Sequence, residues 1–203
     1  MRPRARGIGI GMGLGITALR AVVGTLFMGH GLQKLAGWFG GHGLAATGGA
    51  FEGMGLRPGK AYAAAAGASE AGGGLLLATG LLTPIGASAV TGAMTVAVSK
   101  VHADKGVWVT GGGYEYNLVL IAAAFAVTAD GPGRLSLDER LGIHASGPAW
   151  ALAQLAAGVL GATAVMRLAE KSQPAEPAAP AMSTDGDRTE GAGMETATAQ
   201  SSS

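Results

Sequence analysis

The sequence predicts an all-α protein: an antiparallel transmembrane helical bundle with four core helices and a fifth near the C-terminus. Hydrophobic residues make up 48% of the chain and charged residues only 13%, whereas soluble domains average about 25% charged residues. The 37 glycines would weaken helices in water, but in a membrane they let helices approach closely. Several apolar segments also approach the length of about 20 residues that spans a bilayer.

The composition excludes several classes of function. The net charge is +1, and the basic residues form no stripe, so a nucleic-acid partner is not expected. The chain has no cysteine, which excludes disulfides, dithiol chemistry, thiolate metal sites and iron–sulfur clusters held by this chain. We therefore expect no intrinsic cofactor.

Residues 1–13 form a basic, glycine-rich start, and the first helix is expected over residues 14–36. The apolar run continues past the length of a signal peptide and has no clear cleavage site before Arg20. The basic start favours a cytoplasmic N-terminus in a multi-pass plasma-membrane protein. Residues 38–60 form a glycine-rich connection with a weakly amphipathic segment, which is expected on the membrane surface.

Three further spans are expected, at residues 61–82, 85–101 and 114–129. Only Thr83 and Pro84 separate the first two of these, so they should pack antiparallel as neighbours. A polar loop precedes the last of the three spans. These spans complete a four-helix core over residues 14–142.

The polar segment after residue 129 contains SLDERL, which predicts one helical turn with Ser136 as its cap and Glu139 at the third position. Residues 148–168 form a fifth apolar span. Residues 169–203 lack aromatic residues and carry more acids than bases, which predicts a disordered acidic tail. Five spans would place this tail outside the cell and four would keep it inside.

Five phrases, in this order, resemble the DoxX family of small membrane proteins. They are FxxHGLQKLxGWFGG (27–41), FExxGLxPGK (51–60), AGASEAGGGLLLATGLLTP (66–84), VHADKGVW (101–108) and GGYEYNL (112–118). The resemblance covers roughly residues 14–142 and implies a four-helix membrane bundle. Some members are described as subunits of thiosulfate:quinone oxidoreductases and others as membrane partners in complexes that handle oxidative and thiol stress. Many members have no established activity.

A cluster of polar residues is expected at the outer end of the bundle. His30, Gln33 and Lys34 share one helix face because they are three and four residues apart. Antiparallel packing brings four further residues to the same leaflet: Lys100, His102, Glu115 and Asn117. Such a set suits hydrogen bonds and proton transfer to a quinone. It is equally typical of a helix-end network at the lipid headgroups, with lysines reaching toward water.

Arg20 and Glu70 are predicted to form an intramembrane ion pair between the first two spans. A bare carboxylate among small residues is costly in a membrane and calls for a partner. The pair is interpreted either as a structural clamp or as a proton-relay or ligand carboxylate.

No metal site is expected. His30 and His102 lie toward one leaflet, as haem ligation would require, but two lone histidines are a weak signal. A zinc site formed with Glu115 lacks the usual ligand spacing. The small-residue motif Ala63, Gly67, Ala71 predicts a close helix contact, either within the chain or between protomers of an oligomer.

These observations predict a membrane subunit of a redox or oxidative-stress complex that contacts quinone in the bilayer. The chain has no catalytic motif of its own, so soluble redox-enzyme partners would supply the electrons. The alternative is a non-catalytic membrane scaffold or a carrier of small molecules.

Overall fold

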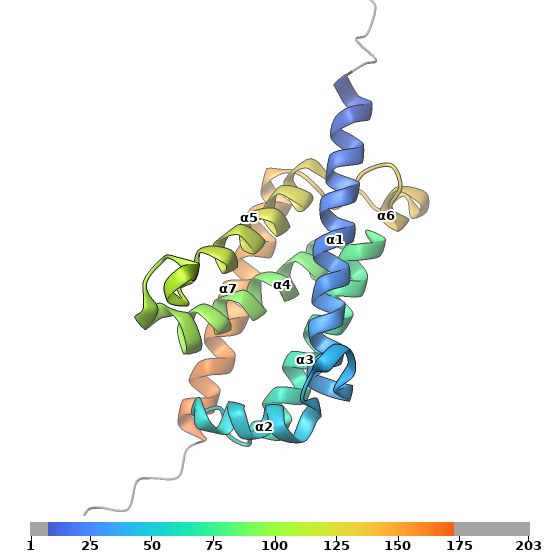
Figure 1. The fold of residues 1–203 in the computed structure, drawn as a ribbon. Coiled ribbons are helices and arrows are strands. Elements are labelled where there is room, and N and C mark those ends of the chain that lie inside the picture. Colours follow the sequence, from blue (N-terminus) through green and yellow to red (C-terminus); the bar gives the residue numbers. More distant parts are fainter. Residues whose placement is uncertain (1–7, 173–203) are drawn as a thin grey trace, which may run out of the picture. The chain divides into compact units, whose positions relative to one another are not determined.

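The structure is a computed structural model that describes residues 8–172, and within this range the chain is all-helical (Figure 1). The predicted all-α class is therefore confirmed. The basic residues 1–7 lie outside the described residues. So does the predicted disordered tail from residue 173 on, although its first residues, predicted from 169, belong to the last helix.

Five long helices coincide with the five apolar segments expected from the sequence. They are α1 (Ile8–Ala36), α3 (Gly59–Thr79), α4 (Thr83–Ala97), α5 (Glu115–Asp130) and α7 (Pro148–Lys171). The first helix begins six residues earlier than predicted. Helix α4 continues without a break into a π-helical turn, η2 (Val98–His102).

Short helices occupy the connections between the long ones. The glycine-rich connection contains η1 (Trp38–Gly40) and α2 (Gly43–Gly53), the loop after η2 contains η3 (Ala103–Lys105) and η4 (Val109–Gly111), and SLDERL forms α6 (Leu137–Leu141). The side-chain oxygen of Ser136 accepts a hydrogen bond from the Glu139 backbone N–H at 3.2 Å. The predicted cap is therefore confirmed.

Glycines bring α1 and α3 into backbone contact. A Cβ atom at Gly24 would lie 2.3 Å from the Ala78 nitrogen, and one at Gly31 would lie 2.3 Å from the Ala71 nitrogen. Residue numbers rise along α1 as they fall along α3, so the two helices are antiparallel. The Gly67–Ala71 part of the small-residue motif packs here, within the chain.

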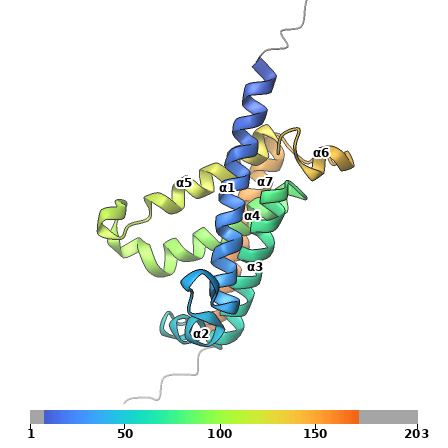
Figure 2. The same cartoon turned by 45° about the vertical axis from the view of Figure 1, so that its right-hand side comes forward.

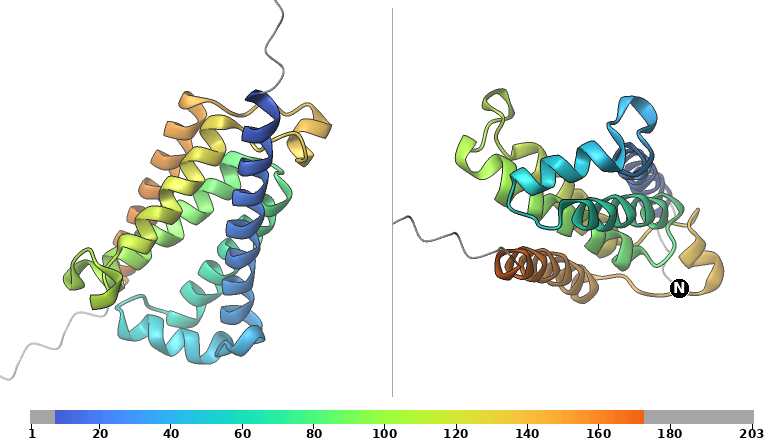
Figure 3. Two further views of the ribbon diagram at one scale, coloured as in Figure 1. Left: turned by 45° about the horizontal axis from the view of Figure 1, so that its top comes forward. Right: turned by 90° about the horizontal axis from the view of Figure 1, so that it is seen from below.

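The remaining long helices pack around α4. Contacts join α4 to α3, α5 and α7; Figure 3 shows α7 running alongside α5, and in Figure 2 α7 is partly hidden behind α1 and α4. Side chains from α1, α3, α4 and α5 form one buried core: Val23, Phe27, Leu77, Ala87, Val90, Leu120, Ala124 and Val127. The fifth long helix, α7, joins the same helical unit through its contacts with α4 and α5.

Arg20 is buried at 2% exposure and does not pair with Glu70. Its guanidinium donates hydrogen bonds to the backbone carbonyls of Ala78, Pro132 and Leu135, the last two at 2.7 and 2.6 Å. The predicted ion pair is wrong because of the helix register. The Gly24 and Gly31 contacts place Arg20 level with Gly80 at the end of α3, ten residues from Glu70, which is about 15 Å along the helix pair.

Asp138, which the sequence did not single out, anchors the start of α4. Its carboxylate is 2% exposed and accepts hydrogen bonds from the backbone N–H groups of Leu82 and Thr83 at 2.7 and 3.0 Å. It also accepts one from the Thr83 hydroxyl at 2.7 Å. Together with Arg20, this carboxylate fixes the loop around α6 to the middle of α1 and to the turn between α3 and α4.

Candidate functional site: a cavity between the helices

A cavity of about 750 Å³ lies between the helices, within the 300–1,000 Å³ typical of small-molecule sites. Residues of α1 to α5, η2 and α7 line it, and most of them are apolar. The polar lining residues are His30, Lys34, Tyr62, Ser69, Glu70, Ser88, Lys100, His102, Tyr116 and Asn117. The structure thus brings five of the seven residues of the predicted polar cluster to one cavity, together with Glu70.

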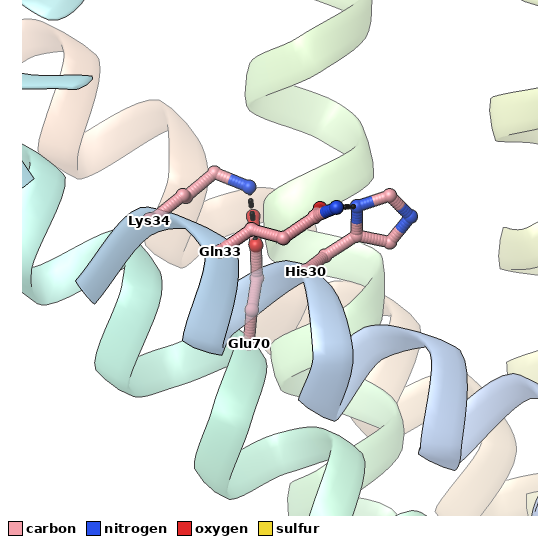
Figure 4. Close-up of polar contacts among 4 residues, drawn as sticks. All are labelled: His30, Gln33, Lys34 and Glu70. Atoms are coloured by element: carbon pink, nitrogen blue, oxygen red, sulfur yellow. Dashed lines mark hydrogen bonds and ion pairs between the residues drawn. The ribbon is translucent and has the colours of Figure 1, made fainter. Parts of the chain in front are cut away.

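Glu70 pairs with Lys34 on the cavity wall. The Lys34 Nζ atom lies 2.5 Å from the Glu70 Oε2 atom, and the side chains are 26% and 9% exposed (Figure 4). The register set by Gly31, Gly67 and Ala71 brings the two residues together. A buried carboxylate is strongly disfavoured without a counter-charge, so Lys34 stabilises the charge that Arg20 was expected to stabilise.

A relay of hydrogen bonds orients His30 and selects its tautomer. The Gln33 side-chain amide donates to the Phe39 carbonyl at 3.2 Å, which turns its oxygen toward the His30 Nδ1 atom at 3.0 Å (Figure 4). An amide oxygen only accepts hydrogen bonds, so Nδ1 carries a proton. In the neutral ring, Nε2 therefore keeps its lone pair.

The loop after α1 holds this relay in place. Phe39 adopts a left-handed backbone conformation with φ of 52°, which is rare for a residue other than glycine. Gly41 approaches so closely that a Cβ atom there would lie 2.5 Å from the Cα and Cβ atoms of Gln33. The GWFGG sequence thus lets the backbone wrap around the Gln33 side chain, and backbone strain of this kind is often found at functional sites.

His102 is fixed in the same tautomer from the other side of the cavity. Its Nδ1 atom lies 2.7 Å from the Gly112 carbonyl oxygen. A carbonyl only accepts, so Nδ1 is again the protonated nitrogen and Nε2 of the neutral ring has a lone pair. The π-helical turn η2 places His102 together with Lys100 on the cavity wall.

Charge on the cavity wall is not balanced. The wall carries the cations of Lys34 and Lys100 and the anion of Glu70, which leaves one positive charge when both imidazoles are neutral. Among residues 8–172, the ion pairs are Lys34–Glu70 and Arg167–Glu170, so Lys100 has no carboxylate partner within the described part. An electron-rich oxygen of a ligand would be attracted to it.

Residues 15–103 match the DoxX family model. The chain carries a DoxX domain. The matched region contains α1 from residue 15 onward, α2 to α4 and η2, and with them His30, Lys34, Glu70, Lys100 and His102. Comparisons with curated proteins and with solved structures gave no match.

The DoxX domain and two long helices indicate a membrane protein that contacts the lipid bilayer. In the described part of the chain, α1 from Gly13 onward and α7 are long and apolar enough to cross a membrane. Both helices include lining residues of the cavity, so the site lies between helices of this class.

Two residues of the predicted cluster lie elsewhere in the structure. Gln33 lines a second hollow of about 320 Å³, and Lys34 lines both hollows. Glu115 begins α5 and is not among the lining residues of either hollow; its backbone N–H donates to the Val107 carbonyl at 2.8 Å. In residues 8–172 no group of three or more metal-ligating His, Asp or Glu side chains comes together.

Other lining residues were missed by sequence reasoning. Tyr62 and Ala66 precede Glu70 by eight and four residues and share its side of α3. That spacing was a usable signal. The lining residues of α7 carried none, because all of them are small or apolar and lie outside the DoxX match.

Proposed function

We propose that this DoxX protein is a multi-pass plasma-membrane protein, with its N-terminus in the cytoplasm, and that its cavity binds the ring of a quinone. In this role it serves as a membrane subunit of a redox or oxidative-stress complex. One observation carries the proposal: two imidazoles, two lysines, an asparagine and Glu70 line a single, mostly apolar cavity.

The lining residues suit both redox states of a quinone ring. The ammonium groups of Lys34 and Lys100 and the side chain of Asn117 are hydrogen-bond donors, which the carbonyl oxygens of an oxidised quinone require. The Nε2 lone pairs of His30 and His102 are acceptors, which the hydroxyl groups of a quinol require. A protonated imidazole would donate to the quinone instead, so proton gain and loss at these rings fits the change of redox state.

Electrons must come from a partner. Reduction of a quinone to a quinol consumes two electrons and two protons, and this chain has no cysteine and no metal-ligand group in its described part. We assign the electrons to a soluble redox-enzyme partner and the handling of protons to the cavity. The subunits of quinone-linked oxidoreductases in the family are consistent with this division.

Quinone binding can be tested on the purified protein. Lipid extracts of the full-length protein should contain quinone, and a tail-less benzoquinone should bind to quinone-depleted protein. His102→Ala should weaken that binding about tenfold or more, which corresponds to about 1.4 kcal/mol. His144→Ala is the matched control, because His144 is exposed in the loop after α6 and does not line the cavity.

Absence of quinone from the purified protein would overturn the proposal if added quinone also failed to bind. A protein with no quinone in its extract and no binding of added quinone is not a quinone-binding subunit. The mostly apolar wall favours a second candidate in that case, a carrier or scaffold for another apolar molecule. Binding of an apolar dye displaced by lipids but not by quinones would support that candidate.

A further inference from the structure

The wall that α7 contributes to the cavity is entirely apolar. The five lining residues of this helix are Ala157, Gly158, Gly161, Ala162 and Val165, which recur at the spacing of one helix face. The histidine, lysine and glutamate side chains of the lining all come from α1, α3 and η2. The cavity thus has polar walls suited to a ring and one apolar wall to which the quinone proposal assigns nothing.

The cavity is larger than a quinone ring requires. Its volume of about 750 Å³ lies in the upper half of the range for drug-sized ligands, and a benzoquinone ring is smaller than such ligands. The apolar wall also continues to the surface, because Val165 is still 41% exposed. A chain attached to the ring therefore has both room inside the cavity and a way out toward lipid.

Two glycines on α7 differ in how much open space surrounds them. A Cβ atom at Gly158 would lie 2.6 Å from the Cβ atom of Thr91, so Gly158 is where α7 packs onto α4. A Cβ atom at Gly161 would meet no atom within 4 Å, although Gly161 also lines the cavity. One glycine is needed for helix packing, whereas the other leaves open space.

We infer that α7 forms the binding wall for the apolar tail of the quinone, and that Gly161 keeps this wall open. The inference rests on the proposed quinone site and names its ligand class: quinones with a long hydrocarbon tail. The tail gains affinity by burying apolar surface against the small residues of α7. The fifth helix, outside the matched DoxX region, is thus a specificity element of the site.

Three probes separate the tail from the ring: a benzoquinone with a decyl tail, the same ring without a tail, and decanol. Binding to the full-length, quinone-depleted protein is measured by equilibrium dialysis at a fixed detergent concentration. The decyl quinone should bind wild-type protein at least tenfold more tightly than the bare ring or decanol. Gly161→Leu should weaken decyl-quinone binding at least tenfold and leave binding of the bare ring within twofold.

The matched control is Gly72→Leu. Gly72 also lies within a helix, a Cβ atom there also meets nothing within 4 Å, and it does not line the cavity. It should change neither affinity. Gly161→Ala should give a smaller loss than Gly161→Leu, and Ala157→Val on the same wall replaces the leucine variant if that variant does not fold.

Several results would overturn the inference. They are equal affinity of wild-type protein for the decyl quinone and the bare ring, equal affinity for decanol and the decyl quinone, or no effect of filling Gly161. In each of these cases, bare-ring binding that depends on His102 would leave the quinone site itself intact. Absence of all quinone binding would remove both.

Discussion

The Lys34–Glu70 pair gives a sharp test of the register between α1 and α3. Replacing Lys34 with Met should destabilise the protein by about 2–4 kcal/mol, since loss of one partner of a buried pair costs about 3–5 kcal/mol and Lys34 is partly exposed. Glu70→Gln in the Lys34→Met background should recover part of that loss. The coupling energy between the two sites is then about 2 kcal/mol.

Arg20 provides the comparison. It lies about 15 Å along the helix pair from Glu70 and shares no partner with it. Sites so far apart are additive to within about 0.5 kcal/mol. The Arg20→Met and Glu70→Gln changes should therefore add, even though Arg20→Met alone is destabilising because it leaves three carbonyls without their donor.

The assay is a pair of double-mutant cycles in mixed micelles. The free energy of unfolding is obtained from titration with sodium dodecyl sulfate, followed by the circular dichroism of the helices. Coupling between Arg20 and Glu70 with none between Lys34 and Glu70 would refute the register derived from the glycine contacts. The residues of α1 and α3 that are proposed to contact the quinone ring in the cavity would then have to be reassigned as well.

Three other predictions concern the fold and the site. Asp138→Ala should lower the free energy of unfolding by about 2–4 kcal/mol, since three hydrogen bonds to a buried carboxylate are lost. The control is Glu139→Gln at an exposed position, which should change the free energy of unfolding by no more than about 0.5 kcal/mol. Similar losses from both variants would contradict the anchoring role of Asp138. Gly31→Ala should destabilise the protein by about 1–3 kcal/mol because the added methyl group meets the α3 backbone. Gly29→Ala, with open space around the new methyl group, should be neutral or stabilising. The same titrations with sodium dodecyl sulfate measure both free energies of unfolding, and a tolerated Gly31→Ala would argue against backbone contact. Gln33→Leu should weaken binding of a tail-less quinone several-fold without changing stability, because the amide oxygen no longer holds the His30 ring through Nδ1. Unchanged binding would rule out the tautomer relay.

Local patterns in the sequence predicted the helices well. Apolar segments became the five long helices, and the Ser136 cap formed as expected, because both depend on residues close together in the chain. Hydropathy alone, however, says nothing about the offset between two helices. That offset decided the partner of Glu70.

A signal for the offset was present in the glycines. Gly24 and Gly31 are seven residues apart on α1, and Gly67 and Gly74 are seven apart on α3. Antiparallel backbone contact at both pairs places Glu70 level with the turn before Lys34 and excludes Arg20. The partners of Arg20 had no such signal, because they are backbone carbonyls and every residue has one.

The polar cluster was predicted from topology, which fixes the end of a helix but not the direction of a side chain. Lys100, His102 and Asn117 do line the cavity, whereas Glu115, two residues from Asn117, does not. A difference of two residues on a helix is about 200° of rotation. Only the structure distinguishes these neighbours.

The π-helical turn at the end of α4 makes the orientation of His102 depend on the number of residues in that turn. A π turn holds one more residue than an α turn and is often found at functional sites. Deleting one residue, such as Ser99, would remove the extra residue and leave the orientation of His102 almost unchanged, whereas winding the same five residues as an ordinary α-helix would rotate His102 by about 100° about the axis. The imidazole would then leave the cavity wall with no substitution in the site, so the position of this ring depends on a count of residues as much as on their identity.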